Sequence, residues 1–167
     1  MSNENLNNQE AVDKLKKLVD SIDICLFCTD VNNGKMNVAP MSRQEVDENG
    51  NIWFLANAES HTCKNIEKDQ NVVLNFANAS NYEFLSVHGT ATSSRDQARI
   101  DKYWNKMMEA WFEKGKEDPS IRIIQVNPSD AEFWETKDGK VITFLKVAAS
   151  ALTGKSVDTG NEGKLSL

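Results

Sequence analysis

The stretch that decides the fold is ICLFCTDVNNGKMNVAPMSRQEVDENGNIWFLA, residues 24–56. Its three segments of strand character are 24–29, 36–46 and 52–56. The two connections, 30–34 and 47–51, are rich in Asn, Asp and Gly, which tolerate the left-handed backbone of tight turns. Because strands joined by such short turns run antiparallel, this stretch predicts a three-stranded meander.

The same patterns continue on both sides of the meander. Further strands are expected at 72–76, 84–92, 121–126 and 131–135. Apolar residues at helical spacing, with a capping box at Ser94 and Gln97, predict helices over 8–22, 60–69, 94–112 and 141–152. Strands that arrive in hairpins favour a closed or nearly closed antiparallel barrel over a doubly wound parallel sheet, and the Gly-rich turn of a Rossmann fold is absent. The predicted fold class is α+β, mainly β, with peripheral helices.

The chain is expected to form one domain, since it has 167 residues and neither repeats nor a linker. Residues 1–153 would make up this domain. The end of the chain, residues 154–167, is rich in Gly and Ser and is expected to be a loosely ordered tail. Gly89 falls inside an expected strand and indicates a bulge or a close backbone approach there.

The composition argues against several classes of partner. The net charge is -6, and Asp and Glu outnumber Lys and Arg, whereas a nucleic-acid surface needs clustered cations. No apolar run approaches the roughly 20 residues of a membrane helix. Residues 1–10 lack the apolar region of a signal peptide. We therefore expect a cytoplasmic protein with no nucleic-acid and no membrane partner.

The cysteines suggest a reducing environment. Cys25, Cys28 and Cys63 are odd in number, which does not suit a disulfide framework. Cys25 and Cys28 form a C-x-x-C pair within an apolar strand, whereas redox pairs lie at exposed helix starts, so buried core cysteines are favoured over a redox pair. Only His61 and His88 could add to a metal ligand set, and no metal site is predicted.

Pattern alone identifies no catalytic motif, and the catalytic residues stay unknown. Ser60, His61 and Thr62 come at a helix start, where backbone N–H groups and side-chain donors could face an anion. The alternatives are that Ser60 only caps the helix and that His61 is a solvated surface residue. Trp104 and Trp111 lie seven residues apart on one expected helix face, which suits a core as well as a cofactor wall.

Several short motifs occur in a characteristic order between residues 11 and 152. They are Ala39-Pro-Met-Ser42 with Gln44, Trp53-Phe-Leu-Ala56, Ser60-His-Thr62 with Ile66, Val87-His-Gly89, Trp104 with Ala110-Trp-Phe112, and Asn127-Pro128 with Ala131-Glu-Phe-Trp134. In this order they resemble the pyridoxamine 5'-phosphate oxidase-like split-barrel flavoproteins, in particular their general stress protein branch. The resemblance implies an antiparallel split β-barrel and a homodimer that holds flavin mononucleotide (FMN) at its interface.

The resemblance also implies a place for each part of the cofactor. The flavin ring would lie along Pro40, Met41 and Ser42, with Gln44 near its hydrogen-bonding edge. The ribityl chain would be lined by Phe54, Leu55 and Ala56. The phosphate would be held at a helix start by Ser60, His61 and Thr62, with Lys64 as an auxiliary charge.

Two tryptophans complete the implied site. Trp134 corresponds to the residue that reaches the flavin from the partner subunit, and Trp111 with Phe112 would wall the same cleft. Two departures predict weak flavin binding: Ala39 stands where relatives usually carry Arg, and Thr62 where many carry Lys. Each lost charge-assisted bond would cost about 1.5 to 3 kcal/mol. The arginine that oxidases carry about ten residues after the Trp134 position is also absent, so true oxidase activity is not expected.

Two functions of different classes follow from this resemblance. One is a flavin-dependent oxidoreductase that acts on an unknown small molecule by hydride transfer at the flavin ring. The other is a non-catalytic stress protein that binds or sequesters flavin, with a weak or empty cofactor site. The dinucleotide FAD or a deazaflavin stays open as an alternative to FMN.

Overall fold

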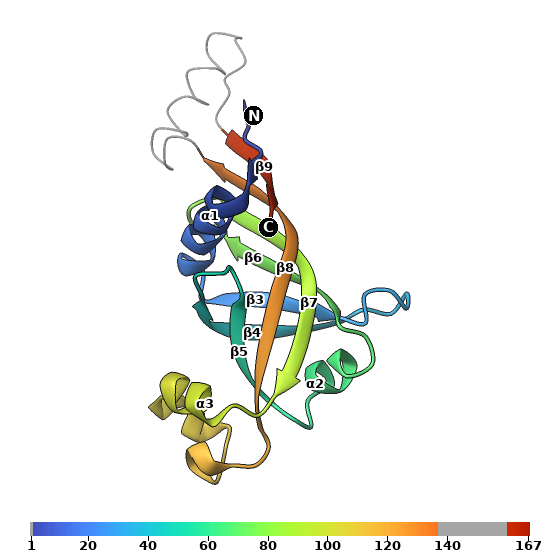
Figure 1. Ribbon diagram of the computed structural model, residues 1–167, viewed down its shortest axis with the longest axis vertical. Coiled ribbons are helices and arrows are strands. Elements are labelled where there is room, and N and C mark those ends of the chain that lie inside the picture. The colour runs from blue at the N-terminus through green and yellow to red at the C-terminus, as the bar shows by residue number, and fades with distance from the viewer. Residues whose placement is uncertain (1, 137–159) are drawn as a thin grey trace.

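Six antiparallel strands form a closed barrel in the computed structural model, which describes residues 2–136 and 160–167 (Figure 1). The barrel strands are β3 (Ile24–Thr29), β4 (Asn37–Val46), β5 (Ile52–Asn57), β6 (Asn71–Asn78), β7 (Glu83–Ser94) and β8 (Ile121–Thr136). They are ordered β5-β4-β3-β6-β7, and β8 pairs with both β7 and β5 to close the ring. The predicted α+β antiparallel barrel and its meander are confirmed.

Side chains alternate between the inside and the outside of this barrel. In β3, Cys25 and Phe27 are buried, whereas Ile24 and Leu26 are about half exposed. The interior is largely aromatic and aliphatic, and Phe27 meets Phe54 of β5 edge-to-face with 5.2 Å between ring centroids. Burial of such side chains is the main favourable contribution to folding.

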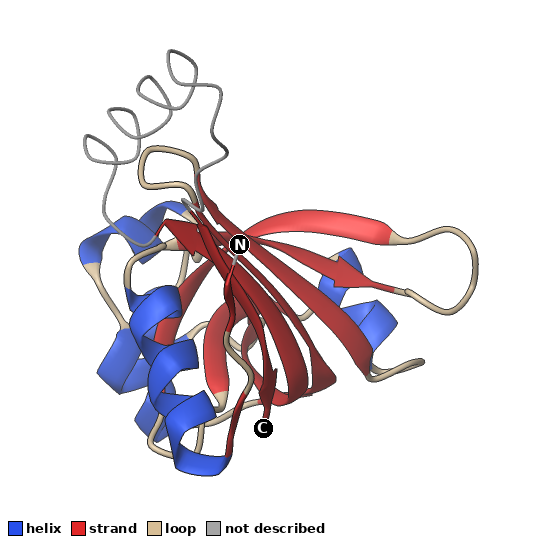
Figure 2. Ribbon diagram, turned by 90° about the horizontal axis from the view of Figure 1, so that it is seen from above, coloured by secondary structure: helices blue, strands red, loops and turns tan. Residues whose placement is uncertain are grey.

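Three α-helices of the described part of the chain cover the barrel. Helix α1 (Asn8–Asp20) buries Ala11, Leu15, Leu18 and Val19 on the main core. Helix α2 (His61–Ile66) buries Cys63 and Ile66. Seen from above, α1 lies on one side of the barrel, together with α3 (Gln97–Tyr103), and α2 lies on the opposite side (Figure 2). Among the described residues, no helix has the length and apolar character needed to cross a membrane.

The helix expected over 94–112 is much shorter in the structure. Ser94 still belongs to β7, and Asp96 caps α3 by accepting a hydrogen bond from the Arg99 N–H at 3.1 Å. The backbone turns extended at Trp104, and a 3₁₀ turn, Lys106–Ala110, follows. The prediction was wrong here because a second capping residue, Asn105, starts this new turn.

Strand β8 is continuous where two strands were expected. It passes through Pro128, opposite Gly89, where the register shifts by a bulge between His88 and Gly89. A Cβ atom on Gly89 would lie 2.3 Å from the Asn127 carbonyl oxygen. The bulge therefore admits a proline that has no N–H to donate, and the close approach expected at Gly89 is confirmed.

The end of the chain is a strand and not a loose tail. Strand β9 (Gly160–Ser166) pairs antiparallel with β8 and parallel with β1 (Ser2–Asn3) and β2 (Leu6–Asn7). Leu165 is fully buried, and a Cβ atom on Gly163 would lie only 1.7 Å from the Glu4 carbonyl oxygen. Gly163 therefore allows β9 to approach the start of the chain closely, although the Gly-rich composition of residues 154–167 suggested flexibility. The helix expected over 141–152 and residues 154–159 lie outside the described residues.

Candidate functional site

Strand β4 changes its pairing partner half-way along its length, from β3 in its first half to β5 in its second half. It pairs with β3 from Asn37 to Ser42, whereas in the described structure its pairing with β5 begins at Arg43. Helix α2 contacts both β4 and β5, and its Asn65 donates to the hydroxyl of Thr29, the residue opposite Asn37, at 3.0 Å. The first half of β4 therefore has an open edge towards α2, which we call the split.

Arg43 fixes the position where the split begins. Its Nε donates to the Val19 carbonyl at 2.8 Å, and its Nη2 donates to the Asp20 carbonyl at 2.9 Å. A cation at the carboxyl end of α1 is favoured by the helix dipole. The next residue, Gln44, is bulged between the pairs at Arg43 and Glu45 and donates to the Ser42 carbonyl at 3.1 Å.

The three β4 residues expected along a flavin ring lie at the split. Pro40 and Ser42 are on the outer face of the barrel, opposite Leu26 and Ile24. Met41 points the other way and packs partly buried against the main core. The backbone of this segment borders the open edge, so it can serve a ligand there without loss of sheet pairing.

The residues expected along the ribityl chain do not share one surface. Phe54 is fully buried in the main core, so its side chain is not available to a ligand. Leu55 faces the opposite side of β5 and packs on the second core under α3. Ala56 packs on the main core but is only partly buried. Of the three, only Ala56 is a small and partly exposed residue on the part of β5 that has no β4 partner.

The start of α2 brings together the residues expected at the phosphate. Ser60 caps the helix by accepting a hydrogen bond from the Cys63 N–H at 3.2 Å, so its capping role is confirmed. His61 is exposed. Thr62 is only 7% exposed, and its hydroxyl makes no hydrogen bond within the described structure. Lys64 forms an ion pair with Glu59 at 2.8 Å.

A second cation near α2 was not expected from the sequence. Arg122 of β8 lies directly opposite Ala56 of β5. The Lys64 hydrogen bond lowers the pKa of the Glu59 carboxyl, and Arg122 adds to this effect, so both cations act at one carboxylate. The β5–β8 register that brings Arg122 here is a long-range pairing that leaves no local signal in the sequence.

The tryptophans expected to wall one cleft lie far apart in a single chain. Trp111 is 79% exposed, and its neighbour Phe112 packs in the second core with Ile121, at the start of β8. Trp134 lies near the other end of β8, which has 16 residues and spans about 50 Å at roughly 3.3 Å per residue. The two tryptophans therefore lie towards opposite ends of β8.

The comparison with known protein families decides the assignment. Residues 10–158 match the family described as pyridoxamine 5'-phosphate oxidase like. The chain belongs to this family. The resemblance that the motifs suggested is thereby confirmed.

Solved structures of this family share the fold. A Jannaschia sp. CCS1 protein with the provisional name general stress protein 26 is 20% identical, with 96% of this chain and 100% of that one covered and a TM-score of 0.77. The general stress FMN/FAD binding protein of Xanthomonas citri is 25% identical, with 77% and 90% covered and a TM-score of 0.64. The likeness to the Jannaschia protein, at its lower identity, shows the fold alone.

A curated relative is longer than this chain. Protein bli-3 of Neurospora crassa is 29% identical over 112 residues, which cover 62% of this chain and 54% of bli-3. The match therefore spans about half of the length of bli-3.

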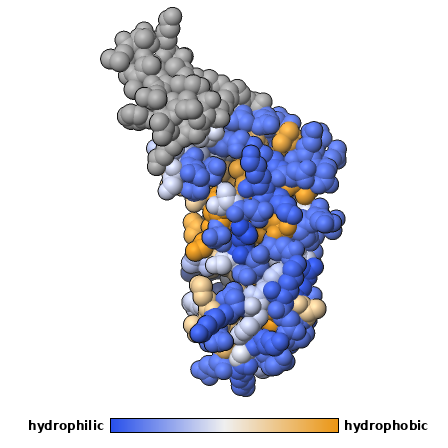
Figure 3. All heavy atoms as spheres, turned by 90° about the vertical axis from the view of Figure 1, so that its left-hand side faces the viewer, coloured by the Kyte–Doolittle hydropathy of each residue, from blue (hydrophilic) through white to orange (hydrophobic). Residues whose placement is uncertain are grey.

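The outer face of the barrel is apolar and exposed in this family member. The large apolar side chains that it exposes include Ile24, Leu26, Val38, Phe84 and Trp134, which we call the outer apolar face. The strand register places Phe84 directly opposite Trp134. Apolar side chains also gather at mid-height of the surface in Figure 3. Extended apolar patches mark interaction surfaces in soluble proteins.

The three cysteines lie in the protein interior. Cys25, Cys28 and Cys63 are buried and unpaired, which confirms the expectation of core cysteines. Burial raises the pKa of the Cys25 thiol to about 12 and also raises that of Cys28. Thiols with raised pKa values are poor nucleophiles, so the C-x-x-C pair does not have the character of a redox site. No group of three metal-ligating side chains occurs in the part of the chain that the structure describes.

Proposed function

We propose that this protein binds FMN in the split as a homodimer and acts as a flavin-dependent oxidoreductase on a small molecule. The observation that carries the proposal is the open edge of β4 beside α2, in a chain of this family. The Xanthomonas citri relative, named an FMN/FAD binding protein, supports a flavin as the ligand. The unpaired cysteines are consistent with the cytoplasm as its location.

The residues at the split fit a phosphorylated flavin in part. The buried Thr62 hydroxyl has no hydrogen-bond partner among the described residues, and a phosphate oxygen would satisfy it. Lys64 and Arg122 supply positive charge on the same side. Glu59 disfavours anion binding here, because its carboxylate repels an anion and its ion pair with Lys64 already occupies that cation. We infer that these two cations partly replace those missing at positions 39 and 62.

The chain's own residues would bind and orient the cofactor. A bound flavin supplies hydride transfer at its ring. The backbone of residues 40–42 would hold the ring edge, and the Gln44 amide, now on the Ser42 carbonyl, would offer polar contacts there. In the dimer, Trp134 of one subunit would cover the split of the other. This cover would exclude water from the reacting face of the ring.

A non-catalytic flavin carrier is the second candidate. It is favoured by Ala39 and Thr62, which lack the cations of relatives, and by the carboxylate of Glu59 near the start of α2. In either case we expect no turnover of pyridoxamine 5'-phosphate. The sequence lacks the arginine that oxidases carry about ten residues after the Trp134 position. Without it, the phosphate of this substrate would lose a charged hydrogen-bond donor.

A flavin titration separates these possibilities. The purified protein is scanned for flavin absorbance, then titrated with FMN and with riboflavin, which has no phosphate. We expect saturable FMN binding that is tighter than riboflavin binding. Loss of the oxidised flavin spectrum on addition of NADH or NADPH would support the enzyme, and a bound flavin that stays oxidised would support the carrier. No binding of either flavin would contradict both.

A further inference from the structure

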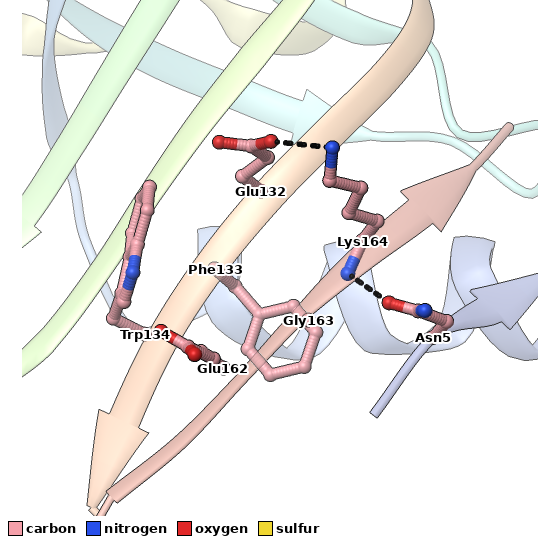
Figure 4. Close-up of a pocket in the computed structure, with 7 residues that line it drawn as sticks. All are labelled: Asn5, Glu132, Phe133, Trp134, Glu162, Gly163 and Lys164. Carbon is pink, nitrogen blue, oxygen red and sulfur yellow. Dashed lines mark hydrogen bonds and ion pairs between the residues drawn. The ribbon is translucent and has the colours of Figure 1, made fainter. Parts of the chain in front are cut away.

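A small pocket of about 190 Å³ lies beside Trp134 where β8 meets β9 (Figure 4). Its charged lining consists of Glu132, Glu162 and Lys164. Strand register places Trp134 opposite Glu162 and Glu132 opposite Lys164, so these four side chains leave the sheet on the same face. The pocket is therefore built by one chain and needs no second subunit.

The charges in this pocket do not cancel. Lys164 Nζ pairs with Glu132 at 3.1 Å, which neutralises one of the two carboxylates. The Lys164 backbone N–H donates to the Asn5 side chain at 3.1 Å, which holds the lysine at the rim (Figure 4). Glu162 lies across from the Trp134 indole, at the separation of directly opposed residues in a sheet. Among the described residues, the lining therefore carries one more negative than positive charge, next to an aromatic ring.

We propose that this pocket binds a small organic cation, an ammonium group on a compact apolar body. Trp gives the strongest cation–π contact of the aromatic side chains, and the Trp134 side chain is 36% exposed. A carboxylate beside the ring adds charge attraction to the same group. The apolar body would lie beside Phe84, which is directly opposite Trp134, so that in a dimer the ligand would lie between the two subunits.

The same lining disfavours anions. A phosphorylated or carboxylated ligand would meet Glu132 and Glu162, and Lys164 is already paired with Glu132. If Trp134 reaches the partner's flavin, which rests on the proposed function, the bound cation would lie beside the flavin ring and would mark the substrate class. Cation binding by the pocket itself does not depend on flavin.

Benzylamine and benzyl alcohol test the proposal because they have the same shape and differ in charge near neutral pH. Their dissociation constants are measured by calorimetry on the full-length protein, with and without FMN, and benzoate serves as the anionic analogue. We expect benzylamine to bind about tenfold more tightly than benzyl alcohol, since a cation–π contact on a partly exposed ring lies between the exposed and the desolvated cases. Benzoate should bind most weakly. Equal affinities for the amine and the alcohol would overturn the proposal.

Two variants locate the effect. Glu162→Gln removes the carboxylate beside Trp134 and should abolish the preference for the amine. Asp130→Asn is the matched control, because Asp130 is exposed on the same face of β8 but lies outside the pocket lining. It should leave the preference intact. Equal losses in both variants would show a general charge effect and would refute the site.

The benzylamine and FMN measurements can contradict the two proposals independently of each other. A charge preference in the flavin-free protein, together with no FMN binding, would sustain this inference and contradict the proposed function. FMN binding without a charge preference would do the reverse.

Discussion

Leu26 and Phe27 are neighbours on β3, and they show the difference between the two faces of the barrel. Phe27 is 1% exposed and packs against Phe54, whereas Leu26 is 50% exposed opposite Pro40. Both positions are apolar, so the alternation expected of a half-solvated sheet is missing here. Folding of one chain explains why the inner face is apolar. It does not explain why the outer face is apolar, and we propose that a second copy of the chain covers that face.

The inner face should dominate stability. Phe27→Ala leaves a cavity beside Phe54 and should lower the free energy of unfolding by about 3 to 5 kcal/mol. Urea unfolding at a fixed protein concentration measures the change, with Leu26→Ala on the outer face as the matched control. A similar loss in both variants would remove the distinction between the two faces.

The outer face should dominate association. Leu26→Asp places a charge at the proposed interface and should weaken the dimer by about 2 kcal/mol or more, while the fold is kept. Sedimentation and circular dichroism measure the two effects separately. Ser80→Asp, at an exposed turn position, adds the same charge elsewhere and should leave association unchanged. A Leu26→Asp protein that sediments like the wild type would contradict the interface.

The split is the place where the inner face meets solvent. Ala39 of β4 lies directly opposite Phe27 of β3 on the inner face, yet it is partly exposed because this half of β4 has no β5 partner. Ala39→Arg should therefore add a charge-assisted bond to a bound phosphate, about 1.5 to 3 kcal/mol, and tighten FMN binding roughly tenfold or more. Riboflavin affinity should not change. High salt should reduce the gain. Equal gains for both flavins would rule out a phosphate contact at this position.

A smaller effect is expected at Glu59, which competes with an anion for Lys64 and Arg122. Glu59→Gln should tighten FMN binding about two- to threefold, because one exposed repulsive charge is removed. FMN titrations of this variant and of Glu48→Gln, in an exposed turn, measure the difference. Weaker FMN binding in Glu59→Gln would show that the carboxylate takes part in the site.

The last effect concerns stability and not binding, and it arises in the second core under α3. Lys102 and Tyr103 donate hydrogen bonds to Glu45 at 2.6 and 2.5 Å, which lowers the pKa of that carboxyl. A lowered pKa stabilises the folded state at pH values above the ordinary carboxyl pKa. This stabilisation is lost as the pH falls through the pKa of Glu45 in the folded state. Glu45→Gln should therefore cost up to about 1 kcal/mol near neutral pH and nothing in strong acid. Urea unfolding across this pH range measures it, and a difference that persists in acid would assign the effect to packing.

Local chemistry made most of the barrel predictable from the sequence. The turns at 30–34 and 47–51 carry Asn, Asp and Gly, and these residues define the meander without any knowledge of distant contacts. Strand β9 was missed because its Gly-rich composition resembles a tail. Its stability comes from pairing with β8 and with the start of the chain, which are remote in sequence.

The candidate site was predictable only where it follows a helix start or a strand edge. Ser60 was recognisable as a cap, and residues 40–42 lie at the split. The burial of Phe54 and the approach of Arg122 to Glu59 depend on the β5–β8 register, which no local pattern specifies. The Trp134 pocket was not anticipated, because two of its charged residues belong to β9.

Sedimentation followed at the visible absorbance of flavin reports cofactor binding and assembly in one experiment. If two subunits complete the flavin site, FMN sediments with a species of twice the 18.7 kDa chain mass. FMN that stays unsedimented at saturating protein, or that moves with a single 18.7 kDa chain, would contradict a flavin site completed by two subunits.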